Sequence, residues 1–190
     1  MKAIAINGSA REAGNTEILL KKCLSILKEQ GIEGELIRLC EKKITPCNAC
    51  TLCFKNKDMK CVITNDAFQE VFDKMLAADI IILGSPVYFG SATADITALL
   101  DRAGYVSRAN GNVFSRKLGG PVVVARRAGQ NFTYAQLMFW FMINDMIMPG
   151  STYWNIGFGA AIGEVNEDQE AIQTVTRFAE NLAWLAKKLY

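Results

Sequence analysis

Short apolar runs alternate with longer amphipathic segments along almost the whole chain. The short runs, such as "IIIL" at residues 80–83, are typical of strands that are covered on both faces. In the longer segments, apolar side chains recur every three or four positions, as on one face of a helix. The pattern predicts strands at residues 2–8, 33–39, 79–86, 120–129 and 151–159. It predicts helices at residues 15–31, 65–78, 93–106, 132–146 and 167–189, the first ending at Gly31 and the second capped by Asn65 or Asp66.

This alternation predicts an α/β fold. Strands that alternate with helices through short connections form a parallel sheet with helices on both faces, which is a three-layer sandwich. Ligands of such sheets bind beyond the carboxyl ends of the strands. The search for a site therefore narrows to the loops that follow the strands, and three of these are rich in small polar residues or arginine.

The composition excludes several function classes. The chain has 21 basic and 19 acidic residues and no long run of either sign, so it lacks the basic surface of a nucleic-acid-binding protein. Its apolar start is too short for a secretory signal, and its most apolar stretch, residues 137–150, is interrupted by Asn144 and Asp145 and does not span a membrane. We therefore expect a cytoplasmic protein, in which clustered cysteines bind metal or carry out redox chemistry.

The loop after the first strand, "GSAREAGNT" at residues 8–16, has the character of a phosphate site. It lacks the lysine of a Walker A loop, and its two glycines do not form the GxGxxG dinucleotide turn. Small residues before a helix leave backbone N–H groups free at its positive end, where they hold an anion. Ser9, Asn15 and Thr16 add side-chain donors, and Arg11 adds a charge. The alternative is a solvated turn with Asn15 as the helix cap.

The loop after the third strand, "GSPVYFGS" at residues 84–91, places two aromatic residues at the same edge of the sheet. Aromatic side chains beside a phosphate cradle suit a flat ring with a phosphate tail, such as flavin mononucleotide (FMN), and glycines let the backbone approach the ring. An ordinary turn with two core aromatics is the alternative. Together the two loops predict FMN in preference to FAD or a nicotinamide nucleotide.

Four of the six cysteines fall in the segment "CNACTLCFKNKDMKC", with Cys47, Cys50 and Cys53 in a CxxCxxC run and Cys61 shortly after it. The chain has no histidine, so four thiolates suit either zinc or an iron–sulfur cluster. Structural zinc sites use two separated CxxC pairs, whereas a CxxCxxC run is typical of a bacterial [4Fe–4S] cluster. Reduced cysteines without metal are the third alternative. Cys23 falls at a core position of the first helix and is expected to pack as a small hydrophobe.

The two loops and the cysteine segment together resemble the iron–sulfur flavoproteins of the NADPH-dependent FMN reductase family, over nearly the whole chain. The resemblance implies one flavodoxin-like domain at residues 1–190, a five-stranded parallel sheet of order 2-1-3-4-5 and a cysteine-motif insertion at about residues 44–64. It also implies FMN and a [4Fe–4S] cluster as cofactors. The FMN-binding residues that it implies are Ser9, Arg11, Asn15, Thr16, Pro86, Val87, Tyr88, Phe89 and Gly90, and the cluster ligands are Cys47, Cys50, Cys53 and Cys61.

These features predict an FMN-dependent oxidoreductase that passes electrons between a one-electron donor and a two-electron acceptor. The resemblance implies a ferredoxin-like donor, with NAD(P)H as a further candidate and no nucleic acid or membrane as partner. Arg126 and Arg127 follow the fourth strand at the same sheet edge; Arg127 is a further cofactor-binding candidate, and both could instead meet an acidic partner or be solvated. No catalytic acid or base is expected, because the usual proton shuttle, histidine, is absent.

Two other functions remain as alternatives. One is an NAD(P)H-dependent FMN or quinone reductase without a cluster, and the other is a sensor in which zinc or redox-active thiols control association. The apolar helical segment at residues 132–148 exceeds what one face of the sheet can cover and predicts a homodimer or homotetramer. Because the cysteine segment follows the second strand, we expect the cluster and FMN at one sheet edge, within one chain or across a dimer.

Overall fold

A five-stranded sheet forms the centre of the computed structural model, which describes all of residues 1–190. Every neighbouring pair of strands is parallel, and the order is β2-β1-β3-β4-β5. The strands are β1 (Lys2–Asn7), β2 (Glu33–Arg38), β3 (Ile80–Pro86), β4 (Leu118–Ala125) and β5 (Ile156–Phe158). The predicted α/β fold and strand order are therefore confirmed.

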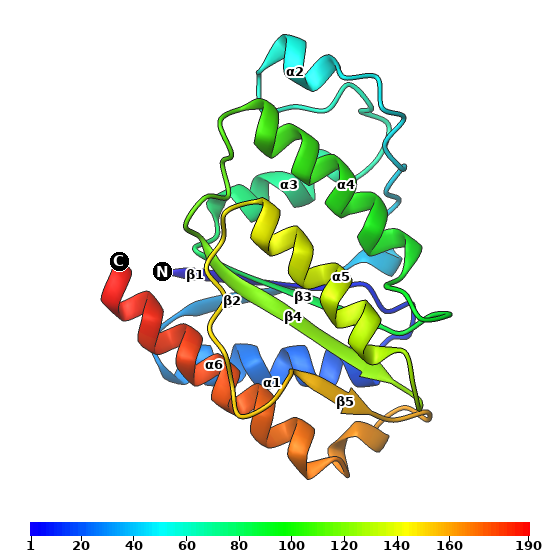
Figure 1. Ribbon diagram of the computed structural model, residues 1–190, viewed down its shortest axis with the longest axis vertical. Helices are drawn as coiled ribbons and strands as arrows, with labels where there is room; N and C mark the ends of the chain where they lie inside the picture. Colours follow the sequence, from blue (N-terminus) through cyan, green and yellow to red (C-terminus); the bar gives the residue numbers. More distant parts are fainter.

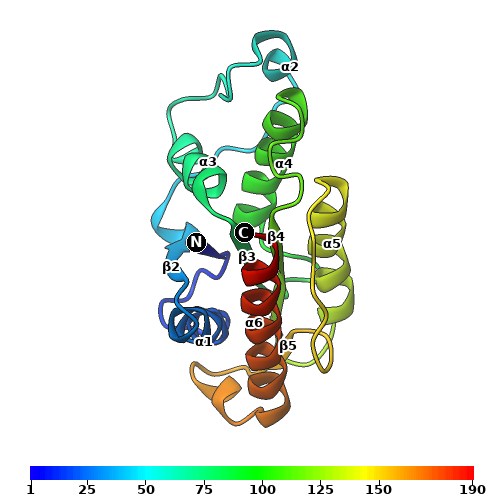
Figure 2. The ribbon, with the colours of Figure 1, turned by 90° about the vertical axis from the view of Figure 1, so that its left-hand side faces the viewer.

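Helices cover both faces of the sheet (Figures 1 and 2). The α-helices are α1 (Asn15–Glu29), α2 (Leu52–Asn56), α3 (Phe68–Ala77), α4 (Ala94–Ala109), α5 (Gln130–Ile143) and α6 (Gln169–Leu189), with 3-10 turns η1 (Leu39–Glu41) and η2 (Glu164–Asn166). Helices α1 and α6 pack on one face, and α3, α4 and α5 pack on the other. Successive residues of β3 point to opposite faces, yet Ile81 and Ile82 are both fully buried, as a doubly covered strand requires. None of the helices combines the length and apolar character that crossing a bilayer requires.

Several element boundaries differ from the predictions. Helix α3 begins at Phe68 rather than Asn65, because Asp66 lies in the preceding turn, where its carboxylate accepts the backbone N–H groups of Thr45 (2.7 Å) and Phe68 (3.1 Å). The apolar fifth helix ends at Ile143, shortly before Asp145, which has a left-handed backbone (φ 56°). The last strand was predicted at residues 151–159 but keeps only three residues, Ile156–Phe158, at the edge of the sheet.

The cysteine segment leaves the carboxyl end of β2 and then turns away from the sheet. Its short helix α2 packs against the carboxyl-terminal half of α4, where the rings of Phe54 and Tyr105 meet edge to face with centroids 6.0 Å apart. Figure 1 shows α2 at the end of α4 that is remote from the carboxyl ends of β3 and β4. The segment thus lies on the outer side of the α4 layer instead of beside the loop that follows β1.

Candidate functional site

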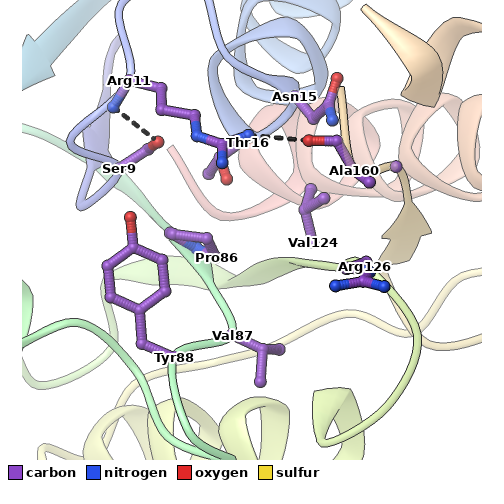
Figure 3. A pocket seen from close by; sticks show the side chains of 11 residues that line it. Ser9, Arg11, Asn15, Thr16, Pro86, Val87, Tyr88, Val124, Arg126 and Ala160 are labelled. Atoms are coloured by element: carbon purple, nitrogen blue, oxygen red, sulfur yellow. Dashed lines mark hydrogen bonds between the residues drawn. The ribbon is translucent and has the colours of Figure 1, made fainter. Parts of the chain in front are cut away.

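A pocket of about 460 Å³ lies at the carboxyl edge of the sheet (Figure 3). Loops that follow β1, β3, β4 and β5 form its walls, so four segments distant in sequence meet there. Its lining consists of Ser9, Arg11, Asn15, Thr16, Pro86, Val87, Tyr88, Val124, Arg126, Gly159 and Ala160. Seven of the ten residues predicted to bind a cofactor are in this lining, while Phe89, Gly90 and Arg127 lie in a neighbouring hollow.

The loop between β1 and α1 presents free hydrogen-bond donors to this pocket. Helix α1 begins after Gly14 and has no side-chain cap, so the backbone N–H groups of Asn15 and Thr16 have no partner within the chain. The Thr16 hydroxyl has none either, and the Ser9 hydroxyl accepts the N–H of Arg11 (3.2 Å), which leaves its own proton free to donate. Because the positive end of the helix dipole points at the same place, the loop forms an anion cradle.

Asn15 and Arg11 line the pocket but bind another part of the chain. The Asn15 amide donates to the carbonyl of Ala161 (2.8 Å) and accepts the N–H of Gly163 (2.8 Å). The Arg11 guanidinium donates to the carbonyl of Ala160 (2.7 Å), as Figure 3 shows. These side chains therefore hold the loop after β5 against the cradle, and Asn15 is not the helix cap. Sequence reasoning missed this loop, because nothing local marks Gly159 or Ala160 as a site wall.

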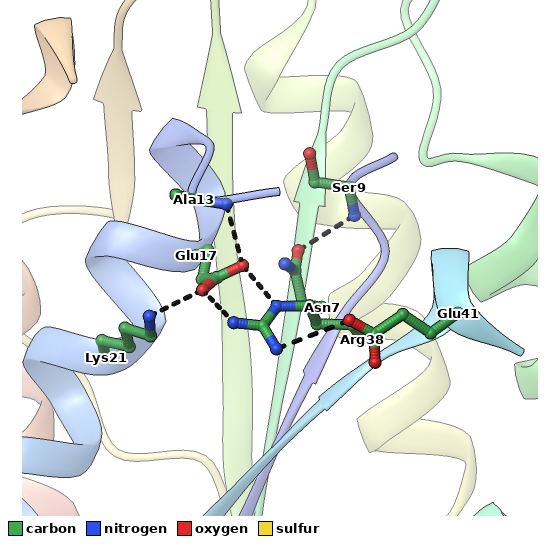
Figure 4. Close-up of polar contacts among 7 residues, drawn as sticks. All are labelled: Asn7, Ser9, Ala13, Glu17, Lys21, Arg38 and Glu41. Atoms are coloured by element: carbon green, nitrogen blue, oxygen red, sulfur yellow. Dashed lines mark hydrogen bonds and ion pairs between the residues drawn. The ribbon is translucent and has the colours of Figure 1, made fainter. Parts of the chain in front are cut away.

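Below the cradle, Glu17 is a fully buried carboxylate in the first turn of α1 (Figure 4). Arg38, at the end of β2, donates two hydrogen bonds to it (2.8 and 2.6 Å), and Lys21 lies 2.7 Å from it. The hydrogen bonds from Arg38, opposed by burial and supported by Lys21, lower the Glu17 pKa to about 2. Glu17 also accepts the N–H of Ala13 (3.3 Å), so this ion pair braces the cradle from beneath.

We expect the Glu17→Gln variant to be less stable than the wild type by about 2–3 kcal/mol at pH 7, because a folded-state pKa about 2 units below the unfolded one contributes stability of that order. This contribution is complete above the unfolded pKa and disappears as the pH falls through the folded value of about 2. The difference between the proteins should therefore shrink to about 1 kcal/mol at pH 3. Urea unfolding of the two metal-free proteins at pH 7 and pH 3 measures this difference in stability. An equal difference at both pH values would contradict the assignment of the lowered pKa to Glu17.

The loop after β3 forms a tight hairpin at the mouth of the pocket. Tyr88 and Ser91 exchange backbone hydrogen bonds (2.9 and 3.0 Å), and the two residues between them, Phe89 and Gly90, both have positive φ (51° and 80°). Such a turn suits glycine but is unusual for phenylalanine, and it leaves the Phe89 ring fully exposed. The Thr93 hydroxyl donates to the carbonyl of Gly8 (2.8 Å), so this loop and the cradle are fixed to each other.

A second hollow of about 420 Å³ adjoins the pocket and shares Val87 and Arg126 with it. Phe89 and Gly90 line it on one side, and Arg127 on the other. The guanidinium groups of Arg126 and Arg127 make no hydrogen bond or ion pair within the chain, and both residues are exposed. The edge of the sheet therefore carries two free positive charges beside the pocket.

The four clustered cysteines line one small cavity of about 20 Å³, together with Arg102, Tyr105 and Val106 of α4. Cys50 is exposed and the other three are partly buried, and burial raises the pKa of Cys53. No three of the sulfurs lie close enough together to bind a single metal ion. The loop around them is tightly wound: Ala49 and Thr51 have positive φ (55° and 58°), and the N–H of Ala49 donates to the Cys47 sulfur (3.4 Å).

The other two cysteines lie outside this cavity. Cys23 is fully buried on the core-facing side of α1, where burial raises its pKa to about 12, and the prediction that it packs as a hydrophobe is confirmed. Cys40 is exposed.

The profile of the NADPH-dependent FMN reductases matches residues 1–161. An iron–sulfur flavoprotein of Methanocaldococcus jannaschii is 37% identical and covers 98% of both chains, and one of Methanosarcina thermophila is 35% identical over 96% of this chain and 93% of its own. The solved structure of RosB, with bound 8-demethyl-8-formylriboflavin-5′-phosphate, superposes with a TM-score of 0.79 at 17% identity, covering 100% of this chain and 80% of RosB. At 17% identity, the likeness to RosB is evidence for the fold alone. The chain therefore belongs to the NADPH-dependent FMN reductase family and, within it, to the iron–sulfur flavoproteins.

Proposed function

We propose that the chain is an FMN-dependent oxidoreductase whose Cys47, Cys50, Cys53 and Cys61 hold a [4Fe–4S] cluster. In this function it passes electrons from a one-electron donor such as ferredoxin to a two-electron acceptor. The observation that carries the proposal is the pairing of two built sites on one chain, an anion cradle beside an aromatic loop and a cavity lined by four thiols.

The chemistry of the pocket fits FMN. The uncapped start of α1 and the Ser9 and Thr16 hydroxyls suit one terminal phosphate, and a second phosphate cradle, as FAD would need, is not present in the lining. Pro86, Val87 and Tyr88 form an apolar and aromatic wall opposite it, which suits a flat ring. Bound FMN supplies the exchange of one or two electrons.

The pocket lining supports electron transfer rather than acid–base catalysis. It contains no carboxylate, no lysine and no histidine; its ionisable side chains are Arg11, Arg126 and Tyr88. Arg126 and Arg127 bring free positive charge beside the pocket, which would suit the negative charge of a reduced flavin. The residues therefore bind, orient and stabilise charge, and none is placed to remove a proton from a substrate.

The cysteine segment suits a cluster better than a zinc ion. Structural zinc sites use two separated CxxC pairs, whereas Cys47, Cys50 and Cys53 form one CxxCxxC run, the spacing typical of a [4Fe–4S] cluster. In a [4Fe–4S] cluster each thiolate binds a different iron, so the sulfurs stand further apart. The cavity has room for about one water molecule. The cavity therefore has to widen before it holds a cluster, and Cys50 is the one exposed cysteine of the four.

The surface around the cysteines suits an acidic electron donor. Lys55, Lys57 and Lys60 lie within this segment, and their side chains are exposed and make no ion pair within the chain. Ferredoxin-like carriers with acidic surfaces would meet complementary charge there, which speeds association at low ionic strength. The proposed donor therefore docks at the cysteine end of α4.

Direct reduction by NAD(P)H is a second candidate, favoured by the hollow beside the pocket. Its two free arginines suit the phosphates of a nicotinamide nucleotide, and its Val87 wall is shared with the FMN pocket. In this function the cysteines would not take part in electron entry.

Anaerobic purification tests both candidates. We expect FMN on chromatography of the denatured supernatant, with iron and sulfide at about four atoms each per chain and no zinc, as one [4Fe–4S] cluster requires. Reduced ferredoxin should bleach the flavin faster than NADPH does. FAD, or no flavin after reconstitution, would contradict the FMN proposal. Protein that contains no iron and whose flavin is bleached rapidly by NADPH would favour direct reduction by NAD(P)H.

We also propose a homodimer or larger homo-oligomer that uses α5. One side of this helix exposes Phe132 (76%), Phe139 (63%), Met142 (60%) and Ile143 (59%), which is unusual on a soluble monomer. The cysteine cavity is lined by the carboxyl-terminal half of α4, whereas the FMN pocket lies beyond the carboxyl ends of the strands and shares no residue with it. An assembly would allow the cysteines of one chain to approach the pocket of another.

Sedimentation velocity at micromolar concentration should show at least a dimer for the wild type. Phe139→Glu places a charge in the middle of the apolar stripe and should shift the protein toward the monomer. Trp184→Glu is the matched control, because Trp184 is equally exposed (61%) but lies on α6, on the other face of the sheet. A wild type that sediments only as a monomer would contradict this proposal.

A further inference from the structure

Arg102 is a buried arginine in the wall of the cysteine cavity. It lies on the carboxyl-terminal half of α4, and only 1% of its surface is exposed. Its guanidinium pairs with the carboxylate of Asp66 at 2.5 Å, and both side chains are completely buried. The central carbon of the guanidinium also stands 4.0 Å over the centre of the Phe68 ring. No feature of the local sequence distinguishes this arginine from the solvated ones.

The same guanidinium binds the cysteine segment at both of its ends. It donates to the carbonyl of Thr45 (3.1 Å) just before the segment and to the carbonyl of Ile63 (2.7 Å) just after it. Its Nε–H points at the sulfur of Cys61 at a distance of 3.3 Å. One side chain therefore ties the two ends of the cysteine segment to α4 and also contacts a thiol directly.

We infer that Arg102 is the positioning residue of the cysteine site, which places Cys61 for cluster binding and raises the reduction potential of the cluster through its Nε–H bond to the Cys61 sulfur. The inference rests on the [4Fe–4S] cluster proposed above and goes beyond it, because Arg102 is no ligand. Reduction adds an electron to a cluster that is already negative. A hydrogen bond from a charged donor to a thiolate favours the more negative state and so raises the potential.

The energetics of the pair support a functional reason for its presence. Burying two charges is costly, and well-packed apolar residues in the same space are often as stable as a buried ion pair. Asp66 also accepts the N–H groups of Thr45 and Phe68, which an amide side chain at this position could accept without Arg102. What an apolar replacement could not supply is an N–H donor at a cysteine sulfur.

The test compares variants of anaerobically prepared, cluster-loaded protein by redox titration. Arg102→Lys keeps the positive charge for Asp66 but loses the planar group that reaches Asp66, Thr45, Ile63 and Cys61 together. We expect the equilibrium constant for cluster reduction to fall about tenfold, which lowers the midpoint potential by about 59 mV for one electron. Iron and sulfide per chain and the electron paramagnetic resonance spectrum of the reduced cluster are measured on the same samples.

Arg108→Lys is the matched control, because Arg108 is an exposed arginine on the same helix that contacts no cysteine. Should Arg102→Lys fail to fold, the double variant Arg102→Gln, Asp66→Asn removes the guanidinium without leaving a buried unpaired carboxylate, and the same lowering is expected. Asp66→Asn alone keeps the contact with Cys61 and should reduce stability while the potential stays near that of the wild type.

The outcomes separate this inference from the function on which it rests. The inference is supported if the Arg102 variants have a lowered midpoint potential while the Asp66→Asn and Arg108→Lys variants keep the wild-type potential. A loaded Arg102 variant with the wild-type potential overturns it, and so does an equal lowering in Asp66→Asn, which would mark a merely structural role. Wild-type protein without iron and sulfide would overturn the proposed cluster itself, and this inference with it.

Discussion

Replacing Cys50 by alanine is expected to remove or convert the cluster while FMN stays bound. Cys50 is the exposed member of the four cavity cysteines, so its loss takes away one ligand without opening a hole in the core. Iron should fall from about four atoms per chain to three or fewer, because a [4Fe–4S] cluster needs a thiolate for each iron. FMN content should not change, since the pocket lies beyond the carboxyl ends of the strands and shares no residue with the cavity.

The kinetic consequence separates electron entry from flavin chemistry. Ferredoxin-driven reduction of the flavin should fall to background in the Cys50→Ala variant, whereas dithionite, a small reductant, should still bleach it. Cys40→Ala is the matched control, because Cys40 is also exposed but lies outside the cavity. If the Cys50 variant accepted ferredoxin electrons at the wild-type rate, the cluster would not be the relay, and direct reduction of FMN would become the better explanation.

Removing both hydroxyls of the cradle, in the variant Ser9→Ala, Thr16→Ala, should weaken FMN binding by about 3–6 kcal/mol, since each hydrogen bond to a charged acceptor contributes about 1.5–3 kcal/mol. At 1.4 kcal/mol for each factor of ten, this is a loss of roughly 100-fold or more in affinity. Both side chains are nearly buried and have a free hydroxyl proton; within the chain, the Ser9 oxygen accepts only the N–H of Arg11, and the Thr16 hydroxyl has no partner. Titration of the apoprotein by quenching of flavin fluorescence gives the dissociation constants.

Ser25→Ala is the control for this measurement, because Ser25 lies on the same helix α1, is exposed and bonds only to Glu29. The dissociation constant of FMN from the Ser25→Ala variant should equal that from the wild type. An unchanged affinity in the double variant would mean that the phosphate does not bind in the cradle. Asn15→Ala is expected to act differently, because Asn15 holds the loop at Ala161 and Gly163 rather than offering a free amide.

The sequence alone was sufficient for the fold and for the position of the pocket. Strand and helix patterns are local, because a residue's burial in a parallel sheet or on a helix face repeats with a fixed period. The alternation then requires a parallel sheet, whose loops after β1 and β3 must meet at one edge. This is why Ser9, Thr16, Pro86 and Tyr88, which lie far apart in the sequence, were placed together correctly.

Only the tertiary structure determined which charged residues are buried and what each one holds. Glu17 pairs with Arg38 across 21 positions, and Arg102 reaches Asp66 across 36 and Cys61 across 41. A charged residue has the same appearance in the sequence whether it is solvated or paired in the interior, because the free energy that decides this comes from partners distant in the chain. The same holds for the wall at Gly159 and Ala160 and for the turn of the cysteine segment toward the far end of α4, since long-range packing, not local pattern, sets where a loop comes to rest.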